Sequence, residues 1–315
     1  MATETFEALL PAFRDADLVF LQGWGEPLLH PDFWTMVRRA SEAGPRVGFT
    51  TNGVALNREN RRALLESGVD VMGVSLAGAR RGTHDRFRQG APLDRLKENL
   101  TALRREGKAL GKTRPDIHLA YLLLAENAGD LPATVELAER WEARQIVVSP
   151  LSLVLTRGLE ARSLLATQPE RRRWKGERSP DEEVTTALKE ARARAHAAGI
   201  EMRVYGFDAR RPRPTCHENV LNSCFVSASG HVSPCVMTNL GLREDARATH
   251  RFQGREIPLR TLSWGNVRDR SLETIWRSGP AGVFRGLHRE RAWRGAGGFE
   301  GLPTPCRTCY KILES

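Results

Sequence analysis

The spacing of hydrophobic and polar residues predicts a regular alternation of strands and helices through residues 1–199. Apolar runs rich in Val, Leu and Phe are short and bounded by polar residues, which is typical of buried strands. Between these runs, apolar residues recur at intervals of three and four, which favours amphipathic helices. The repeated order of strand and helix indicates an α/β fold with a parallel sheet. The predicted strands are Leu18–Gln22, Val47–Thr51, Val71–Leu76, Ile117–Leu124 and Ile146–Leu151.

Three helices are predicted by apolar residues that fall on one face. The first helix follows a cap at Asp32, and the stripes are Phe33, Met36, Val37 and Ala40, then Leu93, Leu96, Leu100 and Leu103, then Leu131, Val135 and Ala138.

A further helix closes this region. Ser179 can cap it, Pro180 lies in its first turn, Glu182 completes a capping box and Gly199 ends it. We therefore expect two domains, residues 1–199 and 200–315.

The pattern changes after residue 200. Cys224–Cys235 predicts a hairpin of two short strands, with a turn at Ser229-Gly230 where glycine can adopt a positive φ. Ser271–Ser278 predicts a short capped helix. The second domain is therefore expected to be a small α+β unit.

Cysteines are confined to this second region. Cys216 and Cys235 are spaced as Cys-x13-Gly-x4-Cys around Gly230, and Cys306 and Cys309 form a Cys-x2-Cys pair. Two separated pairs are what a closed four-thiolate metal site requires, and ligand chemistry alone leaves iron–sulfur and zinc equally open.

The remaining candidate ligands are weaker. Cys224 lies within the predicted hairpin and is expected to be a buried small hydrophobic residue rather than a ligand. His217 and His231 flank the cysteine pair, but polar loop residues are the more common role for histidines in such places.

Composition narrows the class of protein. Five cysteines, an odd number, without an apolar leader do not describe a disulfide framework, so we expect a reducing cytoplasmic location. The longest apolar stretch, Leu119–Ala125, is far too short to span a bilayer, so no membrane association is expected. The net charge of +10 comes from scattered arginines without interleaved aromatic residues, so solvated surfaces are favoured over nucleic-acid binding.

Several short motifs occur in a specific order. Gly23-Trp-Gly25-Glu26-Pro27 follows the first predicted strand, Thr51-Asn52-Gly53 ends the second, and Val74-Ser75-Leu76 ends the third, followed by His84-Asp85 and Arg88. In α/β barrels, ligands bind at these carboxyl ends. A glycine allows a ligand to approach the backbone, and an acidic side chain suits an ammonium group. With Trp264-Gly-Asn-Val267, Ser271-Leu272 and the cysteine pairs, the chain resembles the radical S-adenosylmethionine (SAM) superfamily with a C-terminal SPASM or twitch-type auxiliary domain.

This resemblance implies a fold, cofactors and an activity. The fold is a partial (β/α)6 TIM-like barrel missing its first strand, with the small domain binding an auxiliary 4Fe-4S cluster. The activity is 5′-deoxyadenosyl radical chemistry in an oxidoreductase or maturase that acts on a peptide or small-molecule substrate and uses an electron donor. The implied metal ligands are Cys216, Cys235, Cys306 and Cys309, and the implied SAM-binding residues are Gly23, Gly25, Glu26, Pro27, Thr51, Asn52, Ser75 and Arg88.

One departure from the family pattern is serious. The family's Cys-x3-Cys-x2-Cys motif is absent, because no cysteine occurs before Cys216. We expect either an incomplete gene product, which retention of Gly25-Glu26-Pro27 favours, or a degenerate relative. A second 4Fe-4S cluster is expected only where the missing N-terminus is present, and the chain as given is expected to be inactive. The alternative is a non-catalytic metal-binding protein, with iron–sulfur or zinc, that retains a ligand pocket.

Overall fold

The computed structural model describes residues 1–165, 180–205, 214–241, 248–295 and 299–313. They form two compact units. The first, called the sheet unit, comprises Phe13–Ser149 and Trp174–Val204. The second, called the cysteine unit, comprises Met1–Ala12, Pro150–Arg173 and Tyr205–Ser315. The expected division at residue 199 stays a prediction, since the two units are interleaved along the chain.

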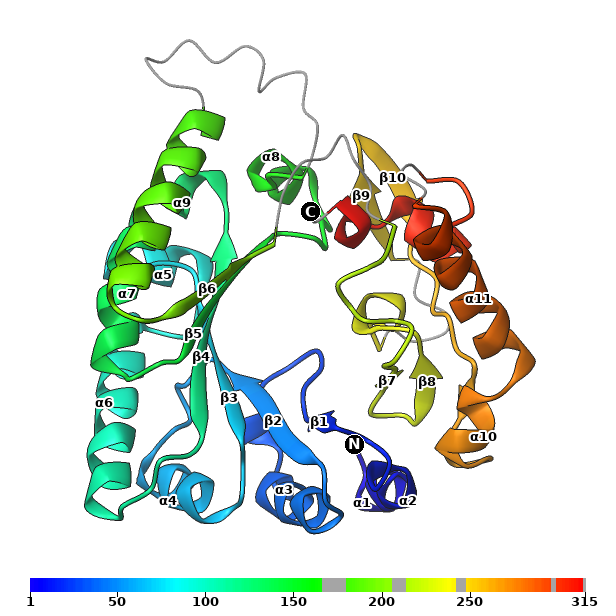
Figure 1. Cartoon of the computed structure of the whole chain (residues 1–315), viewed down its shortest axis with the longest axis horizontal. Helices are drawn as coiled ribbons and strands as arrows, with labels where there is room; N and C mark the ends of the chain where they lie inside the picture. The colour runs from blue at the N-terminus through cyan, green and yellow to red at the C-terminus, as the bar shows by residue number, and fades with distance from the viewer. Residues whose placement is uncertain (166–179, 206–213, 242–247, 296–298, 314–315) are drawn as a thin grey trace. The chain divides into compact units, whose positions relative to one another are not determined.

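A six-stranded sheet forms the centre of the sheet unit (Figure 1), with its strands in sequence order. The pairings β1–β2, β2–β3, β3–β4 and β5–β6 are parallel. All five predicted strands are confirmed within a residue or two at their ends. The strands are β1 (Leu18–Phe20), β2 (Arg46–Thr51), β3 (Val71–Leu76), β4 (Asp116–Leu123), β5 (Gln145–Pro150) and β6 (Glu201–Val204).

Strand β6 was not predicted from the sequence. It follows Gly199 and pairs with β5, with Glu201 opposite Gln145. Its residues alternate between exposed and half-buried, because it lies at the end of the sheet order. An edge strand needs no continuous apolar run, so the criterion that identified the buried strands does not detect it.

Helices pack along one side of this sheet (Figure 1). The three predicted apolar stripes are confirmed, because every residue named for them is buried. Ser179, the expected cap of the last helix, lies outside the described residues. The helices are α3 (Phe33–Glu42), α4 (Arg58–Glu66), α5 (Arg81–Phe87), α6 (Leu93–Ala109), α7 (Leu131–Arg140) and α9 (Pro180–Ala197).

The N-terminal residues form two short helices, α1 (Thr3–Glu7) and α2 (Leu10–Phe13), rather than one continuous helix. Pro11 explains the break. It has no N–H to donate to the Glu7 carbonyl, and its ring crowds that carbonyl.

The cysteine unit is built from small antiparallel sheets. The predicted hairpin is confirmed as β7 (Phe225–Val226) and β8 (His231–Ser233), and β11 (Gly265–Asn266) pairs with β8. Gly230 turns this hairpin with φ of 88°, and a Cβ there would overlap the Asn266 side chain. The remaining elements are α8 (Arg157–Arg162), β9 (Thr249–Phe252), β10 (Arg255–Pro258), α10 (Leu272–Trp276), α11 (Gly279–Arg294) and the 3-10 turns η5 (Thr304–Thr308) and η6 (Tyr310–Leu313).

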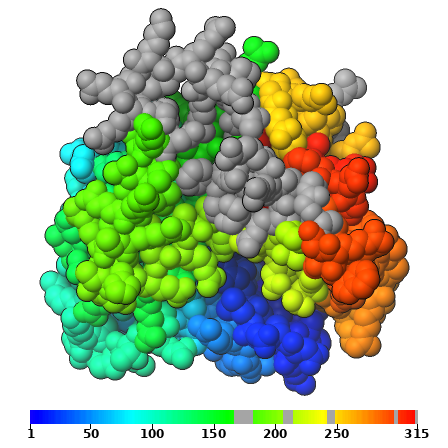
Figure 2. Space-filling view, turned by 45° about the horizontal axis from the view of Figure 1, so that its top comes forward, coloured from blue at the N-terminus to red at the C-terminus, as the bar shows by residue number. Residues whose placement is uncertain are grey.

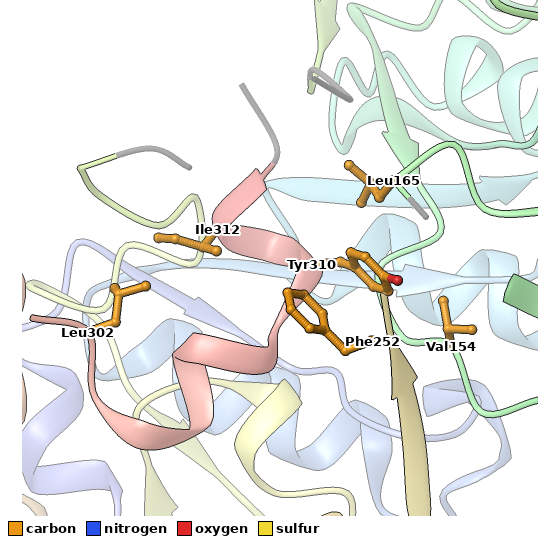
Figure 3. Close-up of a cluster of buried hydrophobic side chains, with 6 residues drawn as sticks. All are labelled: Val154, Leu165, Phe252, Leu302, Tyr310 and Ile312. Carbon is orange, nitrogen blue, oxygen red and sulfur yellow. The ribbon is translucent and has the colours of Figure 1, made fainter. Parts of the chain in front are cut away.

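A compact apolar cluster holds the C-terminal turns of this unit in place. Phe252 of β9 packs against Tyr310, with ring centroids 4.8 Å apart, and Gln253 N donates a hydrogen bond of 2.7 Å to the Tyr310 hydroxyl. Cys216 and Cys306 pack against the same cluster. The cluster therefore fixes the backbone that carries the cysteines. Its buried members are Val154, Leu165, Phe252, Leu302, Tyr310 and Ile312 (Figure 3).

None of the helices in the described part of the chain is long and apolar enough to cross a membrane.

Candidate cofactor and metal sites

The Glu26 carboxylate joins two strand ends at the carboxyl edge of the sheet. Its Oε1 accepts a hydrogen bond of 2.6 Å from Thr51 Oγ1, and its Oε2 accepts one of 2.8 Å from Asn52 N. Oε1 also accepts a weaker bond of 3.3 Å from Leu28 N, which caps the 3-10 turn η1 (Pro27–Leu29). An ionised carboxylate has about four acceptor positions. One position therefore remains for a ligand donor.

The loop after β2 is held tightly beside this carboxylate. Asn52 Oδ1 accepts a hydrogen bond from Val54 N, and the buried Asn99 of α6 donates from its Nδ2 to Gly53 O at 2.8 Å. Gly53 has φ of 75°, and a Cβ there would overlap Leu96 Cδ1. Glycine suits this position best, because its φ lies in the left-handed region and a Cβ would have to displace Leu96 Cδ1.

Arg88 supplies a cation in the sheet unit. It ends α5, which is anchored by His84: the His84 Nε2 lies 3.1 Å from Ala91 O, and Ala77 N lies 3.4 Å from its Nδ1. Burial lowers the pKa of the Arg88 guanidinium, and its buried Nε has no hydrogen-bond partner among the described residues. A buried unpaired guanidinium nitrogen is costly without a partner and suits an anionic group of a ligand.

Other predicted SAM-binding residues follow β1 or lie at the end of β3. Gly23 and Gly25 lie in an exposed bend, and Gly25 has φ of 154° with open space at its Cβ position. Ser75 is half-buried at the end of β3. Within the described residues, the hydrogen bonds join Glu26, Thr51 and Asn52 directly but do not extend to Ser75 or Arg88.

Sequence reasoning missed two supporting residues. Asn99 and His84 are buried and hold the loops that carry Gly53 and Arg88. His84 was noted only as part of a motif. Asn99 lies on the buried face of a helix, where a polar residue among leucines was the available signal.

The four predicted metal ligands lie close together in the cysteine unit. Burial, with a smaller contribution from the nearby Cys235 thiol, raises the pKa of the Cys216 thiol to about 12. Burial also raises the pKa values of the Cys306 and Cys309 thiols, and for each the thiols of both Cys216 and Cys235 add to the increase. Four half-buried thiols within electrostatic range of one another therefore resist ionisation until a cation neutralises them.

Their spacing differs from that of a single-ion site. In the part of the chain that the structure describes, no three His, Cys, Asp or Glu side chains are close enough to hold one metal ion. The thiols are therefore gathered in one region without the short contacts of single-ion ligands.

Cys224 has different surroundings. Burial raises the pKa of its thiol to about 11, and the charged group that acts on it is Arg285 rather than another cysteine. His231 lies 3.2 Å from Ser263 Oγ, and the His217 ring contacts the Tyr205 ring with centroids 4.4 Å apart. The structure thus groups Cys216, Cys235, Cys306 and Cys309 and separates Cys224 from them electrostatically.

Comparison with known families identifies both units. The radical SAM superfamily model matches residues 2–138, and the SPASM model, an iron-sulfur cluster-binding domain, matches residues 216–310. The chain belongs to the radical SAM superfamily. Its second domain is a SPASM domain, and the cofactors of these two domains are SAM and a 4Fe-4S cluster. This confirms the resemblance and the fold class expected from the motifs.

Two radical SAM relatives are each about a quarter identical to this chain over most of its length. The chain is 27% identical over 280 residues to the tungsten-containing aldehyde ferredoxin oxidoreductase cofactor-modifying protein of Pyrococcus furiosus, covering 84% of this chain and 68% of the relative. It is 26% identical over 318 residues to the PqqA peptide cyclase of Xanthomonas axonopodis pv. citri, covering 99% and 72%.

A solved structure confirms the fold. SuiB of Streptococcus suis bound to SAM superposes with a TM-score of 0.61 at 14% identity, covering all of this chain and 64% of SuiB. SuiB has also been solved with its precursor peptide SuiA. The chain thus spans about two thirds of the SuiB length, and this likeness concerns the fold alone.

The residues present fit both cofactors of the radical SAM and SPASM domains. The amino acid portion of SAM carries an ammonium and a carboxylate, and the sheet unit offers the remaining acceptor position of Glu26 and the unpaired Nε of Arg88. The cysteine unit offers four gathered thiols, the donor set that a 4Fe-4S cluster requires.

Proposed function

We propose that this protein is a radical SAM maturase that modifies a peptide, with SAM bound at the carboxyl edge of the sheet and the auxiliary cluster bound by Cys216, Cys235, Cys306 and Cys309. When bound, SAM and a reducing 4Fe-4S cluster supply a 5′-deoxyadenosyl radical that abstracts a hydrogen atom from the substrate. The residues of this chain bind and orient SAM.

The observation that carries this proposal is the pair of opposite charges that Glu26 and Arg88 provide in the sheet unit. Glu26 is held by Thr51 and Asn52 with one acceptor position left, and Arg88 has a buried nitrogen without a partner in the described structure. A zwitterionic amino acid group satisfies both, since its ammonium pairs with the carboxylate and its carboxylate pairs with the guanidinium. Gly25 and Ser75 complete this SAM site in the proposal.

The peptide substrate is supported by relatives rather than by the site. One relative is a PqqA peptide cyclase, and SuiB has been solved with a precursor peptide. The Pyrococcus furiosus relative modifies a cofactor, so a small-molecule substrate is the alternative within the same chemistry. Turnover in either case requires an electron donor.

The experiment that tests SAM binding is calorimetry on the anaerobically reconstituted chain. We expect Arg88→Met and Glu26→Gln each to weaken SAM binding about tenfold or more, because each removes a charge-assisted hydrogen bond. Arg81→Met is the matched control: Arg81 lies on the same helix, has an exposed side chain and pairs with Asp85. Unchanged SAM affinity in Arg88→Met and Glu26→Gln would refute the site.

A second function is favoured by one sequence observation. The 315 residues contain no cysteine before Cys216 and so supply no ligands in the sheet unit for the cluster that cleaves SAM. A non-catalytic protein that binds SAM and one structural cluster fits that observation. We expect no 5′-deoxyadenosine from these residues under reducing, anaerobic conditions, whereas a protein that includes a Cys-x3-Cys-x2-Cys segment encoded upstream in frame should produce it. Failure of such an extended protein to bind a second cluster would favour the non-catalytic function.

A further inference from the structure

Helix α11 buries nitrogen-bearing side chains on the face that meets the cysteines. Arg285, His288 and Arg291 recur at intervals of three and are only 7%, 0% and 3% exposed. Arg285 Nη2 donates to Trp276 O at 2.8 Å, and Arg291 Nη1 donates to Glu300 O. The helix reaches the surface (orange in Figure 2). Val283 and Trp293 of this helix are exposed. Side chains of this kind are seldom buried without a specific partner.

His288 contacts the proposed cluster ligand Cys306. Its Nε2 lies 3.6 Å from Cys306 Sγ, within hydrogen-bond range for sulfur. Its Nδ1 is buried and has no hydrogen-bond partner among the described residues. The Phe284 ring covers it, with centroids 5.1 Å apart. The imidazole is therefore fixed with the Cys306 sulfur as its one polar neighbour among the hydrogen bonds of the described structure.

The two nitrogens of His288 indicate which state of the sulfur this arrangement suits. A neutral imidazole carries one N–H and one bare nitrogen. If the Cys306 thiol donated its hydrogen to Nε2, the N–H would sit on Nδ1 and remain unpaired in the interior. If the sulfur is only an acceptor, as when it is bound to iron, Nε2–H donates to it and the unpaired group is a bare nitrogen. Buried N–H groups without partners are the rarer defect, so the geometry suits an acceptor sulfur.

We infer that His288 is a positioning residue for the auxiliary cluster: its Nε2–H donates a hydrogen bond to the iron-bound sulfur of Cys306 and raises the cluster's reduction potential. The inference rests on the proposed function, since it requires a cluster on Cys306. Reduction adds negative charge to the cluster and its sulfurs. A hydrogen bond to a sulfur stabilises that charge and therefore favours the reduced form.

The test is an EPR-monitored redox titration of the auxiliary cluster in three variants of the full chain. His288→Phe keeps a buried ring of similar size and removes the N–H. His288→Gln places an amide N–H near the position of Nε2 and should restore the bond. Val283→Ala changes an exposed residue of the same helix. We expect His288→Phe to shift the reduction equilibrium about tenfold toward the oxidised form, which is about 59 mV for one electron, with His288→Gln and Val283→Ala close to wild type.

The iron and sulfide content distinguishes failure of the proposed function from failure of the role inferred for His288. If the wild-type chain binds no iron–sulfur cluster, the proposed function fails. If His288→Phe binds a full cluster with an unchanged potential, the proposed function stands and the role of His288 is refuted.

If His288→Phe loses the cluster, a second measurement still tests the inference. Pulsed EPR of the reduced wild-type cluster, with ¹⁵N-labelled histidine, should show a coupled nitrogen that is absent from His288→Gln. A wild-type spectrum without that coupling would overturn the inference.

Discussion

Replacing Glu26 separates its structural role from its proposed role in SAM binding. Glu26→Ala removes the acceptor of two short hydrogen bonds, 2.6 Å from Thr51 Oγ1 and 2.8 Å from Asn52 N. Glu26→Gln keeps an oxygen that accepts from Asn52 N, while its amide can donate to Thr51 Oγ1. The second change removes the charge but keeps most of the contacts between the two strand ends.

The magnitude follows from the surroundings of the two donors. Hydrogen bonds to a charged group contribute roughly 1.5–3 kcal/mol each. Thr51 is 1% exposed, so water does not replace its lost partner, whereas Asn52 is half-buried and is partly compensated by solvent. We therefore expect Glu26→Ala to lower the free energy of opening residues 50–54 by about 2–3 kcal/mol, and Glu26→Gln to lower it by less than about 1 kcal/mol.

Amide hydrogen exchange measured by mass spectrometry is the suitable assay, because it reports local opening within one unit. Exchange of the peptide that contains residues 50–54 should accelerate by about 30-fold to 150-fold in Glu26→Ala. Peptides from the cysteine unit provide the internal reference and should be unchanged. Equal exchange in wild type and Glu26→Ala, or equal acceleration in both variants, would refute the described role of Glu26.

Two further predictions concern the sheet unit. Gly53→Ala should destabilise the sheet unit by about 2–4 kcal/mol in urea unfolding, because φ is 75° and the new Cβ overlaps Leu96 Cδ1. Gly82→Ala in α5 has open space at its Cβ and should be neutral or stabilising. Equal effects of the two changes would contradict this prediction. Burial lowers the pKa of His84 below its ordinary value of 6.5, so the unfolded chain binds a proton first as pH falls. Stability should therefore decrease below about pH 6.5, and a pH-stability profile of His84→Gln should be flatter there than that of wild type; an equal slope would contradict the buried neutral state of His84.

The parts of the fold governed by local periodicity could be predicted from the sequence. Continuous apolar runs identified β1 to β5, and stripes such as Leu93, Leu96, Leu100 and Leu103 identified the buried faces of helices. Strand β6 was not predicted, because its residues alternate between exposed and half-buried positions and form no continuous apolar run. The break between α1 and α2 could have been predicted from the sequence, since Pro11 prevents one continuous helix there.

The candidate sites were only partly accessible from the sequence. The order of the motifs predicted that Glu26 and Asn52 lie at one edge of the sheet. It did not predict that the Glu26 carboxylate already accepts hydrogen bonds from Thr51 and Asn52. Spacing grouped Cys306 with Cys309. The approach of His288 to Cys306 depends on how α11 packs against the C-terminal turn, and no local pattern encodes that contact.

The most direct test of the central claim is the metal content of the anaerobically reconstituted chain and its serine variants. We expect about four irons and four sulfides per chain in wild type and in Cys224→Ser, with loss of both in Cys216→Ser, Cys235→Ser, Cys306→Ser and Cys309→Ser. Zinc in place of iron in anaerobically purified wild-type protein, or loss of the cluster in Cys224→Ser with retention in Cys216→Ser, would contradict it.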